Sequence, residues 1–139
     1  MKSDERKKEK PARQPVARRK PAAKVPRQAS PMMATVLDSM SEHVVCQDTE
    51  NRVLWANKAA ADSVGLVTEQ LVGRFCYAIW QQRNQPCEGC PVVKARETSQ
   101  PQQSEMTSPD GKVWLIRGTP VRDVNGNITS LIETTQDIT

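Results

Sequence analysis

Three of the four cysteines lie in one short stretch, from Gly73 to Pro91. Cys87 and Cys90 form a C-x-x-C turn that contains Gly89 and ends in a proline, and Cys76 precedes this turn. A two-residue gap lets both sulfurs turn toward one point, where they can bind a metal or exchange as a redox pair. This segment is therefore the first candidate for chemistry.

The three thiols Cys76, Cys87 and Cys90 have three competing uses. Three thiolates and a fourth donor suit zinc or an iron–sulfur cluster. Cys87 and Cys90 alone can form a reversible dithiol switch, because a C-x-x-C pair lowers the pKa of one thiol and exchanges readily. The third use is structural, with all the thiols inert. The sequence leaves these three alternatives open.

Two further residues are weaker candidates for the same site. Cys46 is the remaining cysteine and the obvious fourth metal ligand, but in a strand its alternation with Val45 can bury it as a small hydrophobe. His43 is the only histidine. We expect His43 to have a surface or capping role rather than to bind a metal.

The net charge of +4 conceals two different parts. Residues 1–30 contain 11 Lys/Arg against 3 Asp/Glu, whereas the other 109 residues contain 9 against 13. With five prolines and few large apolar residues, residues 1–31 predict a disordered basic tail. Residues 1–30 can make a weak contact with nucleic acid or anionic lipid, because clustered cations attract phosphate without a fold.

The sequence contains no membrane span and no secretory signal, because no apolar run approaches the required length. We therefore expect a cytoplasmic protein. In that compartment thiols stay mostly reduced, which favours metal binding or transient redox chemistry over a structural disulfide.

Hydrophobic spacing and turn residues predict the elements that hold the cysteine segment. A short helix is expected from Met32, followed by two strands, Val44 to Gln47 and Arg52 to Ala56, that form a hairpin. Asn57 is a natural N-cap for the next helix, and Pro91 suits the first turn of a later one. Gly73 is expected to be a turn residue before the cysteine segment.

Three further strands are expected in the second half of the chain: Gln102 to Thr107, Val113 to Val121, and Ile128 to Gln136. An Asp-Gly turn at Gly111 and an Asn-Gly turn at Gly126 connect them, and both dipeptides are strong hairpin signals. The sequence therefore predicts an α+β domain with a five-stranded antiparallel sheet.

From about residue 35 to its end, the chain resembles a PAS domain, a sensory module of signalling proteins. The matching pieces are Trp55-Ala56-Asn57-Lys58-Ala59-Ala60, Leu71-Val72-Gly73-Arg74, Asp110-Gly111-Lys112 and Asp137-Ile138-Thr139. The resemblance implies a PAS domain over residues 32–139, with short helices on one face of the sheet. It is strongest to a subset with a C-x10-C-x2-C-P motif.

In PAS domains the final Asp137-Ile138-Thr139 segment relays the signal from the sheet to an output domain, as in two-component systems, or to a protein partner. Members of the family often form homodimers, so a homodimer is expected here. The sequence leaves two alternatives open: a complete small protein that acts through a partner, which the initial methionine favours, or part of a longer protein with an output domain.

The resemblance also bears on cofactors. Haem-binding PAS domains use a histidine on the helix before the third strand, and this chain has none there. Flavin-binding members have Gly-Arg-Asn-Cys-Arg where this chain has Gly73-Arg74-Phe75-Cys76-Tyr77. We therefore expect neither haem nor flavin.

No catalytic set is recognisable. The single histidine has no Ser-His-Asp context, no phosphate-binding loop occurs, and the C-x-x-C lacks the βαβ pattern of a thioredoxin-like enzyme. We expect a signalling module rather than an enzyme. The alternative is an interaction or dimerisation module with structural cysteines and no cofactor.

Overall fold

The computed structural model describes residues 31–139. The chain separates into two units at residues 35 and 36, and the second unit contains the sheet. The basic tail and its nucleic-acid contact lie outside the described residues, except that Pro31 is the first residue of helix α2 (Pro31–Asp38). The fixed φ of proline suits a first helical turn.

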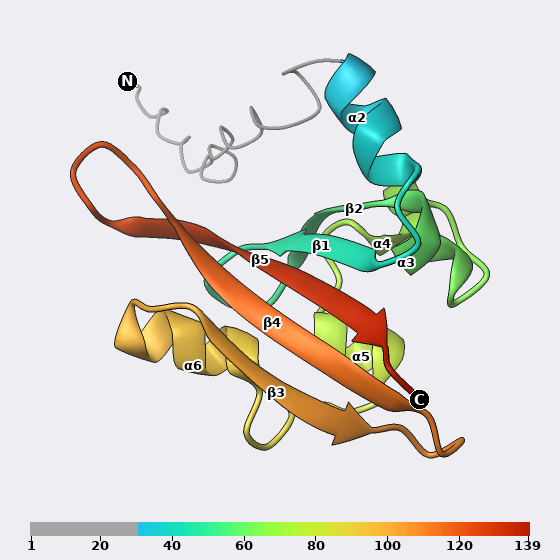
Figure 1. Ribbon diagram of the computed structural model, residues 1–139. Helices are drawn as coiled ribbons and strands as arrows, with labels where there is room; N and C mark the ends of the chain where they lie inside the picture. Colours follow the sequence, from blue (N-terminus) through green and yellow to red (C-terminus); the bar gives the residue numbers. More distant parts are fainter. Residues whose placement is uncertain (1–30) are drawn as a thin grey trace, which may run out of the picture. The chain divides into compact units, whose positions relative to one another are not determined.

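Five strands form one antiparallel sheet in the order β2-β1-β5-β4-β3 (Figure 1). The strands are β1 (His43–Gln47), β2 (Val53–Ala56), β3 (Gln102–Thr107), β4 (Val113–Arg122) and β5 (Ile128–Asp137). The predicted α+β fold class with a five-stranded antiparallel sheet is confirmed. The N-terminal hairpin joins the C-terminal meander through β1 and β5, which pair antiparallel.

Four short helices follow the first hairpin. They are α3 (Lys58–Asp62), α4 (Thr68–Leu71), α5 (Cys76–Trp80) and α6 (Pro91–Thr98). Gly73 and Gly111, two predicted turn residues, have φ of 88° and 89°, a region that favours glycine. No helix within residues 31–139 is long and apolar enough to cross a bilayer.

Helix α6 packs with its backbone directly on the sheet. A Cβ atom built on Gly118 of β4 would lie 2.7 Å from Cα of Val92 and 2.8 Å from the carbonyl oxygen of Pro91. No side chain fits in that space, so the glycine permits the close approach. Val92, Ala95 and Leu131 form a buried cluster beside this contact.

Asn57 connects three parts of the domain and is fully buried. Its Oδ1 accepts from the backbone N–H of Val44 (3.0 Å) and of Ala60 (3.1 Å), which makes it the N-cap of α3. Its Nδ2 donates to the carbonyl oxygens of Leu37 and Glu42, both at 2.9 Å. One side chain thus ties β1, α3 and the segment before β1 together.

We expect Asn57→Ala to lower the free energy of unfolding by roughly 2–4 kcal/mol, because it removes a cap and leaves buried backbone groups unpaired. Urea denaturation measures this loss. Asn127→Ala, in the exposed β4–β5 turn, is the matched control and should change stability by less than about 0.5 kcal/mol. Equal effects of the two substitutions would contradict the assigned role of Asn57.

Candidate functional site

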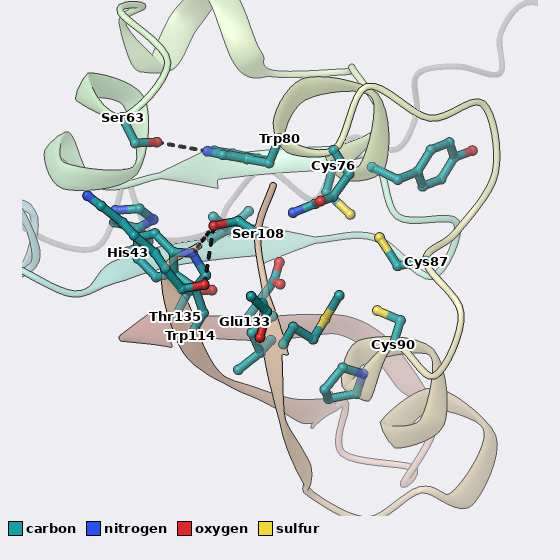
Figure 2. Close-up of a pocket in the computed structure, with 18 of the residues that line it drawn as sticks. His43, Ser63, Cys76, Trp80, Cys87, Cys90, Ser108, Trp114, Glu133 and Thr135 are labelled. Carbon is teal, nitrogen blue, oxygen red and sulfur yellow. Dashed lines mark hydrogen bonds between the residues drawn. The ribbon is translucent and has the colours of Figure 1, made fainter. Parts of the chain in front are cut away.

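A cavity of about 560 Å³ lies between the inner face of the sheet and residues 76–91, which we call the cysteine lid (Figure 2). The lid consists of α5, the following loop and the first residue of α6. Alternate residues of the central strands, including Val45, Ile116 and Glu133, supply the wall opposite the lid. The volume is typical of sites for small molecules.

The cysteine lid brings three predicted site residues to this cavity. Cys76 begins α5, Cys87 lies in the loop, and Cys90 is the N-cap of α6, where Pro91 occupies the first turn. Figure 2 shows all three side chains on the same side of the cavity. None forms a disulfide. The three predicted cysteines therefore line the same cavity.

Burial raises the pKa of all three thiols above the ordinary value, so they are protonated at neutral pH. For Cys76, the negative charge of Glu133 adds to the effect of burial. Arg83 opposes the effect of burial at Cys87, and the backbone N–H groups of Val93 and Val92 oppose it at Cys90. At Cys87 and Cys90 these groups offset only part of the effect of burial, so the pKa of both thiols stays raised.

The cysteines do not form a ready-made metal site. Within residues 31–139, no three His, Cys, Asp or Glu side chains are arranged to hold a metal ion. The predicted zinc or iron–sulfur centre thus has no preformed ligand set. Binding a metal would require the lid to rearrange.

Cys46, the predicted candidate for a fourth ligand, does not reach the cavity. It is 7% exposed, and it alternates with Val45, which faces the cavity. Successive strand residues point to opposite faces, so Cys46 lies on the outer face, where its thiol hydrogen-bonds with Ser130. It is a packed small side chain, the other interpretation that the sequence allowed.

Glu133, which the sequence analysis missed, faces the cavity from β5. Its Oε1 accepts from Nε2 of Gln47 at 2.7 Å, and Oε1 of Gln47 accepts from Nδ2 of Asn51 at 3.0 Å. Glu133 is half-buried and lines the cavity. Burial therefore raises its pKa to about 7, and the hydrogen bond from Gln47 opposes this only in part.

Aromatic groups form the other end of the cavity. The rings of His43 and Trp114 lie 5.5 Å apart, and Trp80 lies across the cavity from them (Figure 2). Nε1 of Trp80 donates to Oγ of Ser63 at 2.9 Å, and Nε1 of Trp114 donates to Oγ of Ser108 at 3.0 Å. His43 is half-buried in the cavity wall, which corrects our expectation of a surface role. Burial lowers its pKa.

The predicted relay segment, Asp137 to Thr139, adjoins this aromatic end. Ile138 N–H donates to the carbonyl oxygen of Val113 at 2.8 Å, and Val113 N–H donates to Oγ1 of Thr139 at 2.9 Å. Nζ of Lys112, a residue of the cavity wall, lies 3.9 Å from Oδ2 of Asp137. Hydrogen bonds and an ion pair thus hold the end of β5, which we call the clamped segment, on residues that lie in or beside the cavity wall.

The raised pKa of Glu133 predicts a pH-dependent stability. Between its ordinary pKa of 4.5 and its folded value of about 7, the folded state binds a proton that the unfolded state releases. The free energy of unfolding therefore falls as pH rises through this window, by on the order of 2–3 kcal/mol.

Urea denaturation of the wild type and of Glu133→Gln across this pH range tests the prediction. The difference in stability between them isolates Glu133, because His43 titrates in both proteins. We expect the wild type to lose stability relative to the variant as pH rises. A difference that stays constant with pH would contradict a buried, titrating carboxylate.

Comparison with known proteins agrees with this architecture. Residues 37–139 match a family model described as the PAS fold. A domain of an HTR-like protein from Haloarcula marismortui has a TM-score of 0.58 and 24% identity, over 72% of this chain and 100% of that one. A sensory box sensor histidine kinase from Vibrio cholerae has a TM-score of 0.61 and 12% identity, over 78% and 90%.

The VqmA dimer of Vibrio cholerae has a TM-score of 0.59 and 22% identity over 79% of this chain, which spans 52% of VqmA. At these identities the solved structures show the fold alone. No curated protein matches the chain. The family model covers most of the sequence, including every strand of the sheet, and the chain therefore belongs to the PAS family.

Proposed function

We propose that this chain is a cytoplasmic, non-catalytic PAS sensor that binds a small molecule in the cavity and passes the occupancy of the cavity to the end of β5. The observation that carries the proposal is the continuity between the cavity wall and the clamped segment Asp137 to Thr139. Trp114 and Lys112 belong to the wall. Trp114 pairs with Asp137 across the ladder, and Lys112 contacts the Asp137 carboxylate.

This continuity supplies the coupling that a sensor needs. A ligand shifts a conformational equilibrium only by its differential affinity for the two states. A molecule that displaces Trp114 or Lys112 changes the contacts that hold the last residues of β5 on β4. The free energy of the contacts between the end of β5 and β4 then depends on whether the cavity is occupied.

The segment Asp137-Ile138-Thr139 passes the signal to a protein partner or to an output domain. The chain acts as a homodimer. Structures of similar fold give precedents for each part. VqmA is described as a dimer, as bound to DPO and as a subject of DNA-binding studies, and the Vibrio cholerae sensory box protein as a sensor histidine kinase. These properties belong to those proteins and serve here as precedents for the proposal.

Filling the cavity tests the proposed function. Met106 lines the cavity from the edge strand β3, whereas Glu105 beside it is exposed on the other face. We expect metabolites that raise the melting temperature of the wild type to stabilise Glu105→Trp equally, because its indole lies outside. Met106→Trp should abolish the shift, because its indole occupies the ligand volume.

Hydrogen exchange provides the second readout of this experiment. A stabilising metabolite should change amide exchange in residues 131–139 of the wild type. A metabolite library that stabilises none of the three proteins, or that stabilises all of them alike, would refute a ligand-binding cavity.

A second candidate function is a redox switch of Cys87 and Cys90. The two residues share a tight turn in which Cys90 N–H donates to the carbonyl oxygen of Cys87 at 3.2 Å. In this step a peroxide takes two electrons and two protons from the two thiols, leaving one disulfide and two waters. Burial keeps the pKa of both thiols above the ordinary value, and Arg83 and the N–H groups at α6 offset only part of that effect, so the attacking thiolate is the minor form at neutral pH.

Oxidation under controlled conditions tests the switch. Hydrogen peroxide should lower the intact mass of the wild type and of Cys46→Ser by the mass of two hydrogen atoms, as measured by mass spectrometry. The masses of Cys87→Ser and Cys90→Ser should not show this loss. The metal alternative is tested by purifying the protein without air and measuring its zinc and iron content. A metal present in the wild type and lost in Cys87→Ser would replace the dithiol interpretation. If peroxide leaves the thiols unchanged and the protein contains no metal, the result would favour an interaction module with structural cysteines.

A further inference from the structure

We propose that the cavity selects an organic cation, an ammonium or a protonated nitrogen heterocycle, whose N–H groups donate to the carboxylate of Glu133. The inference rests on the proposed function, since it names the ligand class for the same cavity. It starts from a carboxylate for which residues 31–139 supply no counter-ion.

Glu133 has no cationic partner among residues 31–139. Its Oε1 accepts from Gln47, and no hydrogen bond or ion pair in this part of the chain reaches its Oε2. The groups of the cysteine lid that interact with it electrostatically are the thiols of Cys76, Cys87 and Cys90. These thiols are neutral when protonated, so none of them can balance the carboxylate.

The other charged groups of the cavity wall, Lys112 and Asp110, lie with His43 at its aromatic end, where the Asp110 carboxylate accepts from Oγ of Ser108. Lys112 contacts Asp137 there, and burial favours the neutral form of His43. Neither interacts with Glu133. A buried carboxylate without a partner must take up a proton or find an external cation, because desolvation is too costly otherwise.

The hydrogen bonds behind Glu133 fix it as an acceptor. Gln47 and Asn51 are 0% and 3% exposed. Because Oε1 of Gln47 accepts from Asn51, its Nε2 is the atom that donates to Glu133. The amide thus supports the charged form of Glu133 and holds one oxygen, while the other faces the cavity. Such an oriented acceptor suits a charged N–H donor.

The remaining wall suits an apolar or aromatic body attached to the cation. Trp80, Trp114 and Tyr77 contribute aromatic side chains, and Val45 and Ile116 contribute aliphatic ones. Aromatic faces also attract cations directly. A volume of about 560 Å³ accommodates an aromatic amine.

Matched probes of opposite charge test this inference with the full chain. Isothermal calorimetry at about pH 8, where Glu133 is ionised and amines remain protonated, compares 2-phenylethylamine and tryptamine with the similarly sized 3-phenylpropanoate. We expect an amine to bind and the carboxylate not to bind. Binding of the amine should weaken as pH falls below about 7, because Glu133 takes up a proton.

Two isosteric variants locate the interaction. Glu133→Gln should weaken amine binding by about tenfold or more, since a charge-assisted hydrogen bond is lost. Glu105→Gln, on the outer side of β3, should leave the affinity unchanged. Circular dichroism confirms that both variants are folded.

Three outcomes overturn the inference: failure of both amines to bind the wild type, equal binding of 3-phenylpropanoate, or unchanged amine affinity in Glu133→Gln. The proposed function is judged separately. A neutral or anionic metabolite whose binding Met106→Trp abolishes would support a ligand-binding cavity and reject selection of a cation.

Discussion

The pairing of β1 with β5 is the constraint on which the rest of this domain depends. Residues at the two ends of the domain meet there, with Gln47 hydrogen-bonded to Glu133 across 86 positions of sequence. Closing so large a loop costs chain entropy that only the completed ladder and its packing repay. The same register sets Val45 opposite Glu133, so the pairing that unites the two halves of the sheet also builds the cavity wall.

The contact between α6 and Gly118 has a comparable effect on the cysteine lid. The first residues of α6, Pro91 and Val92, rest directly on the backbone of β4. Cys90 immediately precedes them, so the position of the C-x-x-C turn follows from the way this helix packs. The position of the turn thus depends on a residue of a distant strand, Gly118, that has no side chain.

Much of the fold could be predicted from local signals. The turn dipeptides, the alternation of the strands and the N-cap at Asn57 all act within a few residues, and they located every strand and the start of α3. The grouping of Cys76, Cys87 and Cys90 in one short segment is visible in their spacing. These features depend on chain geometry over short distances.

The central feature of the site could not be predicted in this way. Glu133 matters because of its partner in β1, and no turn residue specifies that β1 and β5 are neighbours. Alternation of Leu131, Glu133 and Thr135 was the available signal that a carboxylate faces inward. His43 was misjudged for the same reason, because its neighbour Trp114 comes from a strand far along the chain.

The position of β3 at one edge of the sheet has a consequence for solubility. Among the described strands β3 pairs with β4 alone, so its other backbone edge is able to recruit a strand from a second molecule. The strand is six residues long, and its outward positions carry Gln103, Glu105 and Thr107. A short edge with polar and charged side chains is a poor template for aggregation.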